Sequence, residues 1–201
     1  MEMKRIFSAL IPFLLLAVVA AAQGWDNSAL PISKLDQLQR HRGTALAIDY
    51  LQEEKITPIS FFSEIVRDMR TGEIQGGIRI SGFKTVGGVA TIQTFNIDYE
   101  EIDSCIKVLL LAKEQFQREK PKFYTLRAYR TIDGSEIGAY YGGGFWGPKW
   151  SIYFKTNTTL NSWDGITLGS EKIEDVFGIF YRSKYLLKDK LGLKDISNKQ
   201  Q

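Results

Sequence analysis

The chain has 201 residues, of which 44% are hydrophobic and 24% charged, and 26 Lys and Arg stand against 23 Asp and Glu. These proportions are ordinary for a globular protein and exclude a disordered or collagen-like chain. The formal net charge of +3 disfavours nucleic acid as a partner, because phosphate binding requires clustered cations. We expect one domain, or two small halves packed together.

Residues 1–22 have the pattern of an export signal. Two cations precede the apolar run Ile6–Val19, and three alanines follow it as a signal peptidase site. The run is shorter than the roughly 20 residues that span a bilayer. We predict cleavage between Ala22 and Gln23, which leaves a periplasmic or extracellular chain without a transmembrane span.

Residues 23–55 are expected to form an exposed tail followed by a helical segment. Ser33 is a suitable N-cap for a helix over Lys34–Gln39, which Gly43 then interrupts. The segment Thr44–Glu54 is compatible with a continued helix and almost equally with a strand.

The first half of the predicted domain, residues 56–121, consists of strands and then one helix. Segments rich in β-branched and aromatic residues, separated by turn residues such as Gly87–Gly88, predict strands. These strands are Ile56–Met69, Glu73–Phe83 and Val89–Ile97. Asp98 and Glu101 have the spacing of a capping box, which predicts a helix over Tyr99–Gln117 with one apolar stripe.

The second half, residues 122–191, repeats this plan, and residues 192–201 form a polar tail. Its predicted strands are Phe123–Ile132, Glu136–Tyr141, Trp150–Lys155 and Ile166–Leu168. Asp133-Gly134 is a two-residue hairpin signal. A helix over Ser170–Lys190, capped by its first residue, closes the half.

In each half the last strand leads directly into the helix. The junction of the first half, Phe95–Asp103, aligns without gaps with that of the second half, Ile166–Glu174. A duplication explains this, and so does the preference of any helix for acidic residues at its N-terminus. We predict an α+β fold in which two antiparallel sheets, or one continuous sheet, carry the two amphipathic helices on one face.

This element order, strands followed by one helix and then repeated over Ile56–Leu191, resembles the duplicated repeat of the whirly and PUR-type single-strand-binding proteins. The resemblance implies single-stranded nucleic-acid binding, whereas the export signal disagrees with the intracellular role of those families. No motif of theirs stands in the chain, so none of their functional residues transfers. The signal followed by a small mixed domain is similar to uncharacterised exported proteins of Gram-negative bacteria.

A loop rich in glycine and aromatic residues is the candidate binding surface. Its consecutive glycines permit backbone conformations closed to other residues, and its flat rings offer faces for a sugar ring, base or lipid. The candidate ligand-binding residues are Tyr140, Tyr141, Phe145, Trp146 and Trp150. The alternative interpretation is a hairpin loop whose aromatic side chains fold back over the sheet edge.

No catalytic residue, metal site or cofactor is predicted. His41 is the only histidine and stands between two arginines, whereas zinc sites and catalytic triads need a histidine held by another polar group. Cys105, the only cysteine, lies within the predicted helical stripe and is expected to be buried.

We therefore expect a non-catalytic secreted or periplasmic domain that binds an unknown ligand or protein. The alternatives are a module for single-stranded nucleic acid and a small hydrolase that uses Asp133, Glu136 and Tyr140. The sequence does not determine the oligomeric state.

Overall fold

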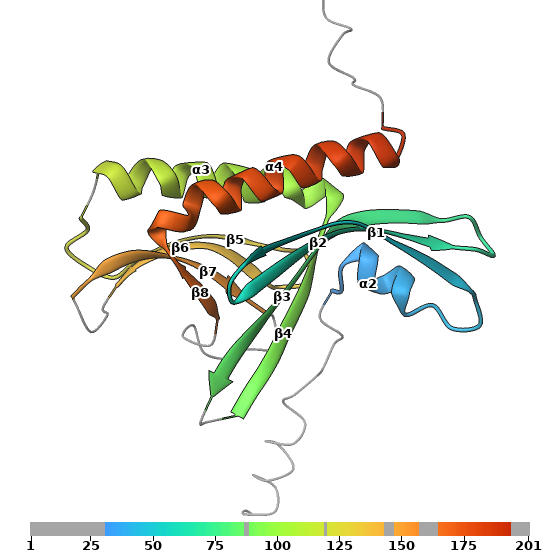
Figure 1. Ribbon diagram of the computed structural model, residues 1–201, viewed down its shortest axis with the longest axis horizontal. Helices are drawn as coiled ribbons and strands as arrows, with labels where there is room; N and C mark the ends of the chain where they lie inside the picture. Colours follow the sequence, from blue (N-terminus) through green and yellow to red (C-terminus); the bar gives the residue numbers. More distant parts are fainter. Residues whose placement is uncertain (1–30, 87–88, 119, 143–146, 157–164, 194–201) are drawn as a thin grey trace, which may run out of the picture. The chain divides into compact units, whose positions relative to one another are not determined.

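The computed structural model describes residues 31–86, 89–118, 120–142, 147–156 and 165–193, all within one compact unit that begins at Pro31. The predicted signal, the Gly87–Gly88 turn and most of the polar C-terminal tail lie outside the described residues. The described residues form two four-stranded antiparallel sheets and two long helices (Figure 1). The predicted α+β fold is thereby confirmed, with two sheets rather than one.

Sheet A has the strand order β1-β2-β3-β4. Its strands are β1 (Leu46–Ile56), β2 (Ile59–Asp68), β3 (Ile74–Val86) and β4 (Val89–Asp98). β1 falls in the segment that the sequence left open between helix and strand. It pairs with β2 along its whole length, with one irregularity between Tyr50 and Gln52. Pairing with a neighbouring strand therefore decides the secondary structure of a segment whose local preference is ambiguous.

Sheet B has the order β5-β6-β7-β8. Its strands are β5 (Thr125–Arg130), β6 (Glu136–Gly142), β7 (Lys149–Lys155) and β8 (Ile166–Gly169). The chain turns between β5 and β6 at the predicted place, but the loop has three residues rather than two: the Thr131 backbone N–H donates to the Ser135 carbonyl at 2.8 Å and leaves residues 132–134 outside the pairing. Gly134 has a φ of 83°, and the Asp133 carboxylate accepts from the Ser135 backbone N–H at 2.9 Å.

The two long helices each open with a short 3-10 turn. η1 (Tyr99–Glu101) leads into α3 (Ile102–Arg118), and η2 (Ser170–Lys172) leads into α4 (Ile173–Lys190). The predicted capping box of Asp98 and Glu101 is present. Cys105 is completely buried on the apolar face of α3, as predicted, and burial raises the pKa of its thiol. Among the described helices, none combines the length and the apolar character needed to cross a bilayer.

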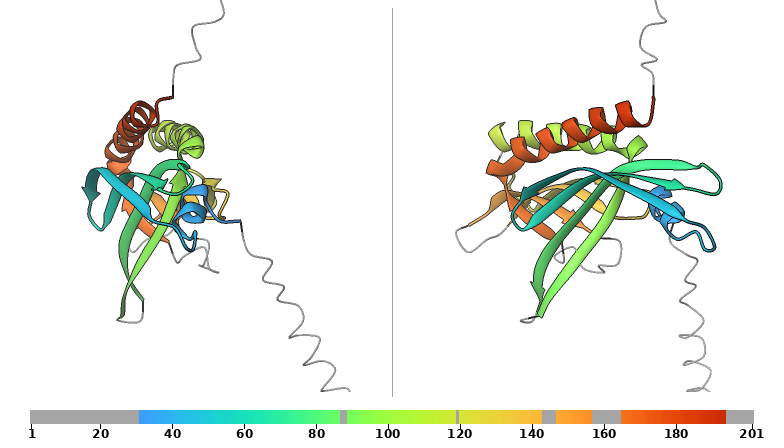
Figure 2. Two further views of the ribbon diagram at one scale, coloured as in Figure 1. Left: turned by 90° about the vertical axis from the view of Figure 1, so that its right-hand side faces the viewer. Right: turned by 45° about the vertical axis from the view of Figure 1, so that its right-hand side comes forward.

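Each long helix packs on the sheet of the other half. α3 follows sheet A in the chain but contacts β5 and β6, whereas α4 follows sheet B but contacts β1, β2 and β3. The two helices lie side by side over the sheets (Figures 1 and 2). Beneath them Phe61 of β2 meets Phe180 of α4 and Phe154 of β7, with ring centroids 6.2 and 5.7 Å away. The halves therefore share one core.

The short helix α2 (Lys34–Gln39) lies on the opposite face of sheet A from α4 (Figure 1). Its predicted boundaries are confirmed, and the Ser33 hydroxyl accepts from the Asp36 backbone N–H at 3.1 Å. The Asp98 carboxylate also accepts from the first N–H groups of α2, at 2.7 and 3.1 Å. We call the face of sheet A that carries α2 its outer face. α2 covers one end of this face.

Candidate functional site

The aromatic residues predicted to form one ligand site do not share one surface. Tyr140 and Tyr141 are neighbours on β6, and successive side chains of a strand point to opposite faces. Trp150 pairs with Tyr141 and is only 6% exposed, because it packs into the core beneath α3. The remaining two, Phe145 and Trp146, lie outside the described residues.

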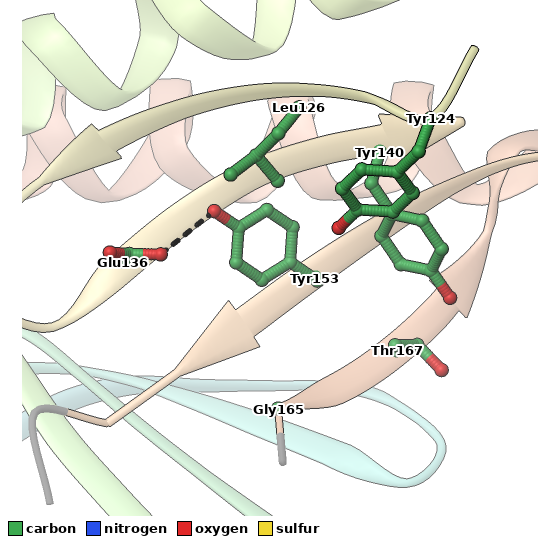
Figure 3. A pocket seen from close by; sticks show the side chains of 7 residues that line it. All are labelled: Tyr124, Leu126, Glu136, Tyr140, Tyr153, Gly165 and Thr167. Carbon is green, nitrogen blue, oxygen red and sulfur yellow. Dashed lines mark hydrogen bonds between the residues drawn. The ribbon is translucent and has the colours of Figure 1, made fainter. Parts of the chain in front are cut away.

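Tyr140 belongs to a tyrosine cluster on the outer face of sheet B, the face turned away from α3. Its ring centroid lies 6.0 Å from that of Tyr124 and 6.1 Å from that of Tyr153. The cluster lines a small pocket (Figure 3). The other residues that line the pocket are Leu126, Glu136, Gly165 and Thr167. Strands β5 to β8 each contribute to it, because their alternate residues point to the same face.

Glu136 is the charged centre of this pocket. It accepts from the Tyr153 hydroxyl at 3.1 Å (Figure 3) and from the Arg130 guanidinium at 2.6 Å. Burial opposes the ionisation of Glu136, but these hydrogen bonds outweigh it and lower the pKa of the carboxyl group. Burial, followed by the neighbouring carboxylate, raises the pKa of Tyr153. At neutral pH the pair is an anion and a neutral phenol, which makes Glu136 a poor general acid.

The size of the pocket and its single carboxylate argue against the hydrolase alternative. Its volume of about 30 Å³ accommodates a water molecule or two, not a substrate. Glycoside hydrolysis generally uses two carboxyl groups, and Glu136 is the one carboxylate among the described lining residues. Asp133, the other carboxylate of that alternative, is occupied by hydrogen bonds within its own turn.

A larger hollow, which we call the sheet A groove, lies on the outer face of sheet A beyond the part that α2 covers. Its volume is about 620 Å³, within the range of roughly 300–1,000 Å³ typical of small-molecule sites. Its principal lining residues are Tyr50, Gln52, Phe62, Arg79, Ser81 and Thr94. None of them was predicted as a site residue from the sequence.

The register of sheet A places the side chains of Tyr50, Phe62, Arg79, Ser81 and Thr94 on the same face of the sheet. Phe62 of β2 pairs with Arg79 of β3, and two residues further along β3, Ser81 pairs with Thr94 of β4. Tyr50 of β1 remains 56% exposed at the edge of the sheet. The alternation in β3 was a usable sequence signal, since Ile78 and Ile80 are completely buried while the residues between and after them point outward.

Arg79 is fixed at the centre of the groove by an ion pair. One guanidinium nitrogen lies 2.6 Å from Oε2 of Glu64, whose side chain is completely buried. Gln39 of α2 donates to the other oxygen of Glu64 at 3.0 Å. Burial raises the pKa of Glu64, and the charge of Arg79 opposes that rise. The guanidinium carbon also lies 4.9 Å from the ring centroid of Tyr50.

Within the ranges that the structure describes, no three His, Cys, Asp or Glu side chains gather where they could hold a metal ion. His41 is 45% exposed, and its Nδ1 lies 3.4 Å from an oxygen of the buried Asp68. No known protein-family model matches the chain, and no curated protein matches it. The geometry of the two sheet faces therefore provides the evidence for a function.

Proposed function

We propose that the chain is a non-catalytic binding module that holds its ligand in the sheet A groove. The observation that carries the proposal is a hollow of about 620 Å³ in which Tyr50 and Phe62 present aromatic rings next to the hydroxyls of Ser81 and Thr94. Ligand sites typically combine apolar and aromatic walls with a few polar groups that fix orientation. The groove has this composition.

The groove is a better candidate than the surfaces suggested by the sequence. The tyrosine pocket on sheet B has about one twentieth of its volume, 30 against 620 Å³. Trp150, an aromatic residue of the predicted loop site, is buried in the core. Tyr50, by contrast, leaves more than half of its surface exposed.

The proposal is tested by isothermal titration of the wild-type chain against three probes: neutral oligosaccharides, a single-stranded oligothymidine and a proline-rich peptide. We expect at least one probe to bind with a Kd below about 1 mM. The double variant Tyr50→Ala/Phe62→Ala should lose that binding while keeping its circular dichroism spectrum. Phe83→Ala is the matched control, because Phe83 is 61% exposed on the same sheet but does not line the groove.

Two results would reject the proposal: binding of no probe by the wild-type chain, or equal binding by the wild-type chain and the double variant. Loss of binding in Phe83→Ala alone would indicate that the ligand binds near Phe83 on β3 and not in the groove.

We also propose that the module works after export. The support is the sequence of residues 1–22, in which two cations, an apolar run and three alanines follow one another. Expression of the full chain in a Gram-negative host should yield a periplasmic product. Its intact mass should equal that of a chain that starts at Gln23. A cytoplasmic product that retains Met1 would contradict export and leave the groove proposal intact.

A second candidate function is the binding of single-stranded nucleic acid by the outer face of sheet B. Tyr124, which is 48% exposed, and Tyr140 share this face with Lys149 and Lys155. Aromatic rings interleaved with cations on a sheet are the usual surface for unpaired bases. Fluorescence anisotropy with labelled oligothymidine should then show binding that weakens steeply with salt and decreases in Tyr140→Ala. No anisotropy change at low salt would exclude this candidate.

A further inference from the structure

The exposed ring of Tyr50 and the half-buried ring of Phe62 form a corner in the sheet A groove. The centroids of Tyr50 and Phe62 are 6.2 Å apart, and their planes meet at 67°. A ligand ring that enters such a corner contacts one aromatic face and one aromatic edge at the same time. The face of an aromatic ring is electronegative and attracts polarised C–H groups, such as those on the face of a pyranose. The corner therefore suits a saturated ring as well as a planar one.

The groove contributes little net charge to a ligand. The charge of Arg79 is compensated by the buried carboxylate of Glu64, 2.6 Å away, and its guanidinium is already stacked beside Tyr50 and Phe62. The other charged residue of the lining, Glu53, is ion-paired with Lys55, whose Nζ lies 2.9 Å from its Oε1. A phosphodiester backbone requires uncompensated Lys or Arg side chains along its path. The charges of the groove thus disfavour nucleic acid as its occupant.

The polar groups on the floor of the groove are hydroxyls. The Thr94 hydroxyl donates to that of Ser81 at 3.1 Å. A hydroxyl can both donate and accept. Such groups match the hydroxyls of a sugar, which also donate and accept.

From the aromatic corner, the compensated charge and the hydroxyl floor, we infer that the ligand of the sheet A groove is a neutral carbohydrate chain, one pyranose of which packs on Tyr50 and Phe62. This inference rests on the proposed function and adds the class of ligand to it. The nearest alternative occupants are single-stranded nucleic acid, which requires positive charge, and a proline-rich peptide, which requires only the rings.

The test uses neutral hexasaccharides of glucose and of N-acetylglucosamine, oligothymidine and a proline-rich peptide as separate probes in isothermal titration. We expect a hexasaccharide to bind with an affinity that changes less than about twofold between low and high salt, because no counterions are released. Tyr50→Ala should weaken that binding about tenfold or more. The double variant Ser81→Ala/Thr94→Val should weaken it too, since it removes the hydroxyl floor and leaves both rings. Tyr181→Ala, at a 46% exposed position on α4, is the control that should leave binding unchanged.

The outcomes separate this inference from the proposed function. If only oligothymidine or only the peptide binds, and Tyr50→Ala abolishes that binding, the groove is a binding site but the carbohydrate assignment is wrong. If a hexasaccharide binds and Tyr50→Ala has no effect, the sugar occupies another surface and the inference fails. If no probe binds in a Tyr50-dependent manner, both the inference and the proposed function fail.

Discussion

Removal of the Arg79 side chain should destabilise the fold through Glu64. The Glu64 side chain is completely buried and is held by Arg79 at 2.6 Å and by Gln39 at 3.0 Å. In Arg79→Leu the carboxylate keeps the neutral amide of Gln39 and loses its counter-charge. Breaking one side of a buried ion pair costs about 3–5 kcal/mol. Because the Arg79 side chain is itself 24% exposed, water can partly replace it, and we expect a loss of about 3 kcal/mol in the free energy of unfolding at neutral pH.

The pH dependence of this loss follows from the protonation of Glu64. Burial already raises the pKa of Glu64, and Arg79 opposes that rise. Without Arg79 the pKa of the folded state rises further, so that folding favours the protonated carboxyl group. The penalty is absent where the carboxyl group is protonated in both states, below the ordinary Glu value. The penalty grows as the pH increases from the ordinary Glu value to the raised pKa of the folded state. Its full size is about 1.4 kcal/mol for each unit by which the folded pKa is raised.

Urea unfolding followed by circular dichroism at about pH 4 and about pH 7.5 measures this prediction. Arg79→Leu should lose most of its stability deficit at the lower pH. The double variant Arg79→Leu/Glu64→Gln should recover a large part of it at the higher pH, because the amide is neutral and keeps the contact with Gln39. A deficit below about 1 kcal/mol at pH 7.5, or an equal deficit at both pH values, would refute the reasoning.

Three further predictions concern the core. Phe180→Ala, at a completely buried position, should cost about 3–5 kcal/mol in urea unfolding, whereas Tyr181→Ala at its exposed neighbour should cost less than about 1 kcal/mol. Gly138→Ala places a Cβ 2.0 Å from a carbonyl oxygen of β5 and should cost more than about 2 kcal/mol in the same measurement. In Gly76→Ala the new Cβ meets only the flexible ends of leucine side chains, at 3.0 Å or more, so this variant should lose less stability. A loss as large as that of Gly138→Ala would contradict the difference between a backbone contact and a side-chain contact. The completely buried thiol of Cys105 should react with a thiol reagent only after unfolding, and rapid labelling of the native chain would count against its burial.

Several parts of the fold could be predicted because they depend on neighbouring residues. The helix at Lys34–Gln39 is signalled by Ser33, whose hydroxyl caps it, and α3 is signalled by the capping box at Asp98. The turn at Asp133-Gly134 requires a positive φ that glycine supplies. Such features are determined within a few residues, where hydrogen bonds and backbone sterics act.

The candidate site could not be predicted in the same way. The sheet A groove needs side chains from β1 to β4 to lie next to one another, which requires the register of all four strands. The strand that carries Tyr50 was itself ambiguous, because its apolar residues fit a helix and a strand almost equally well. The separation of Tyr140 from Tyr141, in contrast, was already implied by the alternation of a strand.

The sequence by itself determined the class of the fold, the positions of the two long helices and most of the strand boundaries, because periodicity and capping are local properties of a chain. Only the tertiary structure decided that α3 covers sheet B and α4 covers sheet A. An amphipathic helix buries its apolar stripe against whichever apolar surface lies nearest once the chain has collapsed. The same long-range packing left the aromatic outer face of sheet A partly uncovered, and so produced the groove.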